Sequence, residues 1–191
     1  DVTVSIHWHD HYFICPTRHL LTAGDSYCGV PDVSVCGQCL PENPHCLDAP
    51  LRKTDVAVWR EQWGAVMANA SEIRVFSASS NELIRQVWPA LANTVRCRPH
   101  DVSHINFAPL TPATDSGLSI GVIGRIGRHK GAAEVAALAR HIEREQRTTK
   151  ITVFGTLEER TSPAVVTETG PFAEGELAAL CAAHGINVFW M

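Results

Sequence analysis

Glycines alternate with basic residues in one short stretch of the chain, "GVIGRIGRHKG" at 121–131, which lies between two apolar runs. Glycine lets a phosphate approach the backbone closely, and the N–H groups at the start of a following helix favour anions. Arg125 would add a planar fork of donors and Lys130 a compact positive charge. The stretch therefore predicts a phosphate-binding loop. A tight turn between a strand and a helix, with solvated basic side chains, fits the same residues.

Two standard phosphate motifs are not met by this stretch. A Walker loop needs Ser or Thr after its lysine, whereas Gly131 follows Lys130. The dinucleotide fingerprint needs Gly-x-Gly-x-x-Gly, but Gly121, Gly124 and Gly127 are spaced by three. A nicotinamide-dependent enzyme is disfavoured for this reason, and because no acidic residue is evident at the end of the next apolar strand, "KITVFG".

Histidines alternate near the start of the chain, in "HWHDH" at 7–11. On a strand, His7, His9 and His11 would share one face, because successive side chains point to opposite sides. Such a face can hold a metal ion or take part in acid–base chemistry. It can also be the polar end of a strand that faces a cleft.

Seven cysteines are present, and their spacing allows a metal site. Four thiolates can hold zinc in a tetrahedral site, and His19 or His45 could replace one of them. The candidate ligands are Cys15, Cys28, Cys36 and Cys39. Disulfides and unliganded thiols remain open alternatives, and the role is structural in each case. We expect Cys97 and Cys181 to be core residues.

The elements that would position these residues alternate between strands and helices. Short apolar or β-branched runs predict strands, for example "VTVSIHW", "EIRVFS", "LSIGVIG" and "INVFW". Apolar residues at helical spacing predict helices near 56–70, 80–88, 131–147 and 174–185, the second of them capped by Ser79 or Ser80. This alternation predicts an α/β fold with parallel sheets and helices on both faces.

Composition and charge narrow the classes of function. The chain has 191 residues, is 45% hydrophobic and 19% charged, and carries a net charge of −4. This balance gives no broad electrostatic case for binding nucleic acid, and no apolar run reaches the roughly 18 residues of a membrane helix. We expect a cytoplasmic protein. Both ends read as core strands, which favours a piece of something longer.

The basic stretch resembles the donor loop of a known enzyme family. "GRIGRHKG" has the form Gly-Arg-x4-Lys-Gly after a strand that ends in "GVI". This is similar to the retaining glycosyltransferases of family 4, which have the GT-B fold. "RVFSASSNELIRQVWP", "CRPH" and "SIHWHDHYFICP" resemble further segments of that family, so the resemblance spans most of the chain.

The resemblance implies parts of two Rossmann-like domains. Residues 1–98 would form the C-terminal part of the acceptor-side domain, with a Cys-rich loop at 10–50. Residues 99–117, which are rich in proline, would cross to the N-terminal part of the donor-side domain at 118–191. The family's paired glutamates, Glu-x7-Glu, are expected beyond "INVFWM", so this chain alone is expected to be inactive.

Site residues are carried over from the family by position. Gly124, Arg125, Lys130 and Gly131 would hold the diphosphate of a UDP- or GDP-sugar. The pair His9-Asp10 matches the family's "HD", near the acceptor hydroxyl, where one of them could polarise that hydroxyl. No catalytic metal is expected, and zinc would be structural only.

The implied function is transfer of a sugar from a nucleotide sugar to a glycan or lipid-linked acceptor, with retention of configuration. The expected partners are these two substrates and no nucleic acid. Peripheral association with the inner face of a membrane and self-association through open sheet edges are also expected. The alternative is a non-catalytic, zinc-stapled α/β module that binds a phosphorylated ligand.

Overall fold

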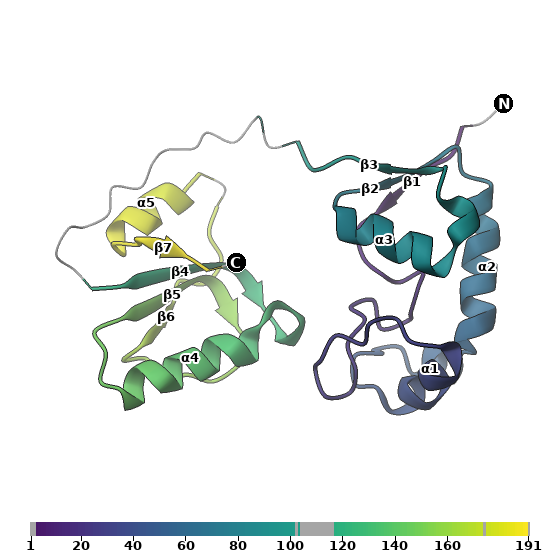
Figure 1. Ribbon diagram of the computed structural model, residues 1–191. Helices are drawn as coiled ribbons and strands as arrows, with labels where there is room; N and C mark the ends of the chain where they lie inside the picture. Colours follow the sequence, from purple (N-terminus) through teal and green to yellow (C-terminus); the bar gives the residue numbers. More distant parts are fainter. Residues whose placement is uncertain (1–2, 102, 104–116, 174, 191) are drawn as a thin grey trace. The chain divides into compact units, whose positions relative to one another are not determined.

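A computed structural model describes residues 3–101, 103, 117–173 and 175–190 of the chain. The chain forms two compact units, residues 1–104 and 105–191 (Figure 1). Most of the predicted crossover at 99–117 lies outside the described residues. Each unit has its own parallel sheet.

The first unit is built on three parallel strands in the order β1-β2-β3. The strands are β1 (Ser5–Trp8), β2 (Glu72–Val75) and β3 (Val95–Cys97), and the helices that connect them are α2 (Val56–Ala68), α3 (Ala78–Val87) and the short 3-10 turn η3 (Pro89–Leu91). One apolar core joins the sheet to both α-helices, through residues such as Trp8, Ile73, Met67 and Ile84. This burial of apolar surface is the main force that holds the unit together.

Side-chain caps determine where the helices of the first unit begin. The Asp55 carboxylate accepts a hydrogen bond from the Ala57 N–H at 2.8 Å, at the start of α2. Ser77 accepts from the Ser80 N–H at 3.2 Å, at the start of α3. The predicted cap at Ser79 or Ser80 is therefore wrong by two to three positions, because these residues already lie inside the first turn.

The Cys-rich segment at 10–50 contains more regular structure than the sequence predicts. A short helix, α1 (Val33–Cys39), is capped at its start by Asp32, whose side chain accepts a hydrogen bond from the Ser34 N–H at 2.9 Å. Two 3-10 turns follow, η1 (Leu40–Glu42) and η2 (Ala49–Lys53). A small core of Cys36, Leu40, Cys46 and Val56 packs beneath them.

The second unit has four parallel strands in the order β6-β5-β4-β7. The strands are β4 (Ser119–Ile126), β5 (Lys150–Leu157), β6 (Val166–Glu168) and β7 (Val188–Phe189). Figure 1 shows α4 (Ala132–Arg144) and α5 (Leu177–Ala183) on opposite faces of this sheet. A separate apolar cluster lies beneath each helix.

The predicted α/β class is confirmed, since both sheets are parallel and helices connect their strands. The arrangement is compatible with a Rossmann-like fold. Cys181 lies in the core of the second unit as expected. Cys97 is exposed instead, because it is the last residue of β3, which lies at the edge of the sheet.

Candidate functional site

The second unit contains a topological switch point at the carboxyl ends of its strands. From β4 the chain moves outward to β5 and β6, and then returns to add β7 on the other side of β4. The strand order therefore reverses between β4 and β7, and the helices of the two connections, α4 and α5, lie on opposite faces of the sheet (Figure 1). Ligands of open α/β sheets bind in the crevice that forms at such a point.

The turn between β4 and α4 contains the basic residues. It passes through a single 3-10 turn, η4 (Arg128–Lys130), closed by a hydrogen bond from the Lys130 N–H to the Gly127 carbonyl at 2.9 Å. Gly131 then adopts φ 81°, a left-handed conformation that favours glycine. It serves as the N-cap of α4 without any side-chain cap. The predicted helix start at Gly131 is thus one residue early.

A pocket of about 480 Å³ lies beside this turn. Lys130, Gly131 and Glu134 line it from the turn and the first turn of α4, and Trp190 lines it from the end of β7. The remaining lining residues are apolar: Val122, Ile123, Ile126 and Val135. Lys130, Glu134 and Trp190 therefore line one pocket, together with apolar residues, at the switch point.

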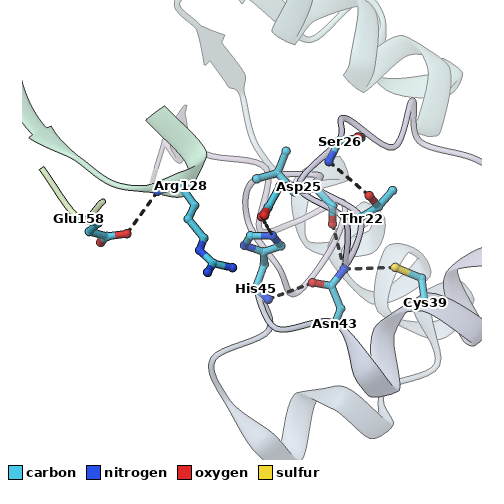
Figure 2. A network of polar contacts seen from close by, with 9 residues as sticks. Thr22, Asp25, Ser26, Cys39, Asn43, His45, Arg128 and Glu158 are labelled. Atoms are coloured by element: carbon cyan, nitrogen blue, oxygen red, sulfur yellow. Dashed lines mark hydrogen bonds and ion pairs between the residues drawn. The ribbon is translucent and has the colours of Figure 1, made fainter. Parts of the chain in front are cut away.

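Arg125 lies outside this pocket. It is the seventh residue of β4, not part of the loop, and its side chain is 81% exposed. Its guanidinium lies 4.0 Å from the Glu158 carboxylate, and the other oxygen of Glu158 accepts from the Arg128 N–H at 3.2 Å (Figure 2). The structure thus places Lys130 and Gly131 in the pocket, whereas Arg125 and Gly124 belong to the adjoining strand.

Glu158 contacts the turn after β4, and sequence reasoning missed its position at the end of a strand. The strand that reads "KITVFG" continues through Thr156 to Leu157, where it pairs with Ile126 of β4, and Glu158 follows directly. An acidic residue therefore does stand at the end of this strand. That argument against a nicotinamide-dependent enzyme is wrong, although the unsuitable spacing of the glycines remains.

The first unit has a second candidate site at the carboxyl ends of its three strands. His9 follows β1, Phe76 follows β2 and His100 lies beyond β3. The Phe76 and His100 rings are stacked at 4.0 Å between centroids, and His9 lies 5.0 Å from Phe76. Three neighbouring strands thus bring two imidazoles and a phenyl ring together. The three residues are far apart in the sequence, so no local pattern indicates this cluster.

The three alternating histidines do not share a strand face. β1 ends at Trp8, and His11 turns back so that its Nδ1 accepts from the Trp8 indole N–H at 3.3 Å. Burial lowers the pKa of His11, an effect that Asp10 partly opposes. His7 and His9 remain neighbours, with ring centroids 6.4 Å apart.

Asp10 is exposed at the turn that follows His9. Its carboxylate accepts a hydrogen bond from the Tyr12 N–H at 2.9 Å, which fixes the side chain over the turn. The pair His9-Asp10 therefore lies at the carboxyl edge of the first sheet, where a ligand of this unit would bind.

The four candidate zinc ligands surround one cavity. Cys15, Cys28, Cys36 and Cys39 all line a space of about 170 Å³, which is otherwise mostly apolar. Burial raises the pKa of the Cys28 and Cys36 thiols, and the other cysteines around the cavity raise it further. All four are free thiols. Among the described residues, no group of three or more His, Cys, Asp or Glu side chains forms a ready metal site.

The two histidines considered as alternative ligands do not line this cavity. His45 Nε2 instead lies 2.8 Å from the Asp25 carboxylate (Figure 2). The His45 backbone N–H donates a hydrogen bond to the side-chain oxygen of Asn43, and the Asn43 amide in turn donates to Cys39 Sγ.

No protein-family model and no curated protein matches the sequence. Across the part of the chain that the structure describes, no helix combines the length and the apolar character needed to cross a membrane.

Proposed function

We propose that this chain carries the donor pocket and part of the acceptor region of a retaining glycosyltransferase similar to family 4, with the GT-B fold. The reaction is transfer of a sugar from a UDP- or GDP-sugar to a glycan or lipid-linked acceptor. One observation carries the proposal: Lys130 and Gly131 line a pocket at the topological switch point of β4 and β7.

The diphosphate would lie against the start of α4. Backbone N–H groups there have no side-chain cap, and the helix end carries partial positive charge. The Lys130 ammonium adds a full charge from the same wall of the pocket. Arg125 is exposed and its guanidinium lies 4.0 Å from the Glu158 carboxylate, a long contact, so it can turn toward a phosphate. These groups would stabilise the negative charge that develops on the leaving diphosphate.

The other polar groups of the pocket suit the rest of a nucleotide. Trp190 presents an indole on which a base can stack. Glu134 offers carboxylate oxygens to ribose or sugar hydroxyls, and a negative charge that would repel a misplaced phosphate. The apolar floor formed by Ile123 and Ile126 excludes water beneath the ligand.

In the first unit, His9 and Asp10 would face the acceptor. A carboxylate or imidazole at this edge can polarise an acceptor hydroxyl, which makes the oxygen a better nucleophile. We assign no protein nucleophile, and the proposed chemistry uses no metal ion.

Calorimetric titration with UDP, GDP and their sugar conjugates tests the donor pocket. The unmodified chain is expected to bind one nucleotide series. Lys130→Ala is expected to weaken binding about tenfold or more, because it removes a charge-assisted hydrogen bond to phosphate. Arg140→Ala, on the exposed side of α4, is the matched control and should bind as the unmodified chain does.

Two results would contradict the proposal. Equal binding of nucleotide by the unmodified chain and Lys130→Ala would place the ligand elsewhere. Tight binding of NADH but not of either nucleoside diphosphate would favour a nicotinamide-dependent enzyme, in which Glu158 would accept hydrogen bonds from a ribose.

A further inference from the structure

We infer that Cys15, Cys28, Cys36 and Cys39 form a four-thiolate zinc centre that holds the segment 10–50 in place. The inference concerns the first unit alone and does not depend on the proposed transfer of sugar. Three separate parts of the segment contribute to the same cavity: the turn after β1, the loop before α1, and α1 itself.

Some of the cysteines line the cavity and others do not. Cys46 is also buried in this segment but does not line the cavity, and Cys97 is exposed on β3. Cys36 and Cys39 are three residues apart on α1, so both face the same side of the helix. Four of the seven cysteines thus face one space of about 170 Å³, and the other three do not.

The sulfur atoms already have hydrogen-bond donors suited to thiolates. The Asn43 amide donates to Cys39 Sγ at 3.1 Å, as Figure 2 shows, and the Thr17 hydroxyl donates to Cys15 Sγ at 3.3 Å. The Arg60 guanidinium lies 3.6 Å from Cys36 Sγ. Asn43 and Thr17 are buried. Hydrogen bonds from neighbouring groups stabilise thiolates that bind a metal ion. The positive charge of Arg60 would also offset the excess negative charge of four thiolates around one Zn²⁺.

The backbone of this segment also needs support. Arg18, Leu20, Asp25 and Val30 all adopt positive φ, between 53° and 68°, which is unfavourable for residues other than glycine. Such conformations persist only where the surroundings enforce them. Leu20 and Val30 are held by the main apolar core of the first unit, whereas Arg18 and Asp25 are exposed. A metal ion bound by three parts of the segment would add a constraint for the exposed part of the loop.

Thiolates are soft ligands that suit zinc, and most of the residues that complete the lining are apolar, among them Leu20, Val35 and Leu40. The thiols surround the space but do not yet meet as a metal ion requires. Rotation of the cysteine side chains inward would bring them together, and each thiol would release its proton to solvent on binding.

Metal analysis of the reduced 191-residue chain, grown with zinc and purified without chelators, is the first test. We expect about one zinc ion per chain. Cobalt substitution should give the intense thiolate-to-cobalt charge-transfer bands and the visible bands of a tetrahedral site. Zinc below about a tenth of this amount, with cobalt spectra lacking thiolate bands, would overturn the inference.

Variants identify the ligands. Cys36→Ser and Cys39→Ser should each lower the zinc affinity about a hundredfold or more, and Cys46→Ser and Cys97→Ser should retain the metal. Equal retention by Cys36→Ser and Cys97→Ser would overturn the assignment. If Cys36→Ser fails to fold, alkylation of the unmodified chain can identify the ligands instead. Bound zinc should protect these four cysteines from alkylation, and removal of zinc by a chelator should make them reactive. Peptide mapping that finds disulfides among the four, or iron with labile sulfide, would also overturn the zinc centre.

Discussion

The Glu158 carboxylate accepts a hydrogen bond from the backbone N–H of Arg128 at 3.2 Å, so an anionic group already lies against the turn after β4 (Figure 2). A diphosphate bound at this turn would be repelled by that charge. Glu158→Gln keeps an oxygen acceptor for the Arg128 N–H but removes the charge. We expect it to tighten binding of UDP or GDP about fivefold at low salt, and less at high salt.

Calorimetry at two salt concentrations measures this effect. Glu145→Gln is the matched control, because Glu145 pairs with Arg144 at the far end of α4. An equal gain in affinity from both variants would show that only the overall charge matters. Unchanged affinity in Glu158→Gln would place the phosphates away from the turn.

Gly155 of β5 faces Gly124 of β4, and both adopt positive φ, 134° and 115°. A Cβ on Gly155 would collide with the Gly124 carbonyl. We expect Gly155→Ala to destabilise the second unit by about 3 kcal/mol or more. Gly185→Ala, which has positive φ but open space around its Cβ, should cost about 1 kcal/mol. Hydrogen exchange of peptides from β4 and β5 measures both, and equal costs would show that the collision is relieved.

The pKa of His11 is lowered by burial from its ordinary value of 6.5. The unfolded chain therefore takes up a proton before the folded one does as the pH falls. The stabilising contribution of neutral His11 is complete above pH 6.5 and is lost as the pH falls through the lower, folded-state pKa. We expect the stability of the first unit to rise with pH across this window.

Urea unfolding followed by tryptophan fluorescence measures this dependence, because four of the five tryptophans belong to the first unit. His11→Gln should flatten the rise, whereas His141→Gln, on the exposed end of α4, should not. A pH dependence that survives in His11→Gln would assign it to other groups.

Local patterns predicted much of the fold. The apolar run of β4 and the helical spacing of α4 are visible in sequence because each element buries one continuous set of residues. The end of β5 was missed because Gly155 and Thr156 interrupt its apolar run, while pairing with β4 extends the strand to Leu157. Strand register of this kind is a tertiary property.

The candidate sites depend even more on long-range contacts. Spacing suggested the four cysteines, and the structure places them around one cavity. The stack of Phe76 on His100 joins two strands, and Trp190 reaches the pocket only because β7 pairs with β4. No local pattern indicates such neighbours. The alternation of His7, His9 and His11 misled because β1 ends at Trp8.

Asn43 is fully buried, and its side chain makes three hydrogen bonds. Its amide donates to the Leu21 carbonyl at 2.9 Å and to Cys39 Sγ, and its oxygen accepts from the His45 N–H at 2.9 Å. Asn43→Ala would leave these partners unsatisfied in a buried place. We expect a loss of about 3 kcal/mol in the stability of the first unit.

Asn69→Ala is the matched control, because the Asn69 amide makes one hydrogen bond, to the Ala65 carbonyl, at an exposed position. It should cost about 0.5 kcal/mol or less. Urea unfolding followed by tryptophan fluorescence compares the two variants. Equal midpoints for Asn43→Ala and the unmodified chain would mean that water replaces the amide without loss. The packing of the Cys-rich segment would then not depend on this side chain.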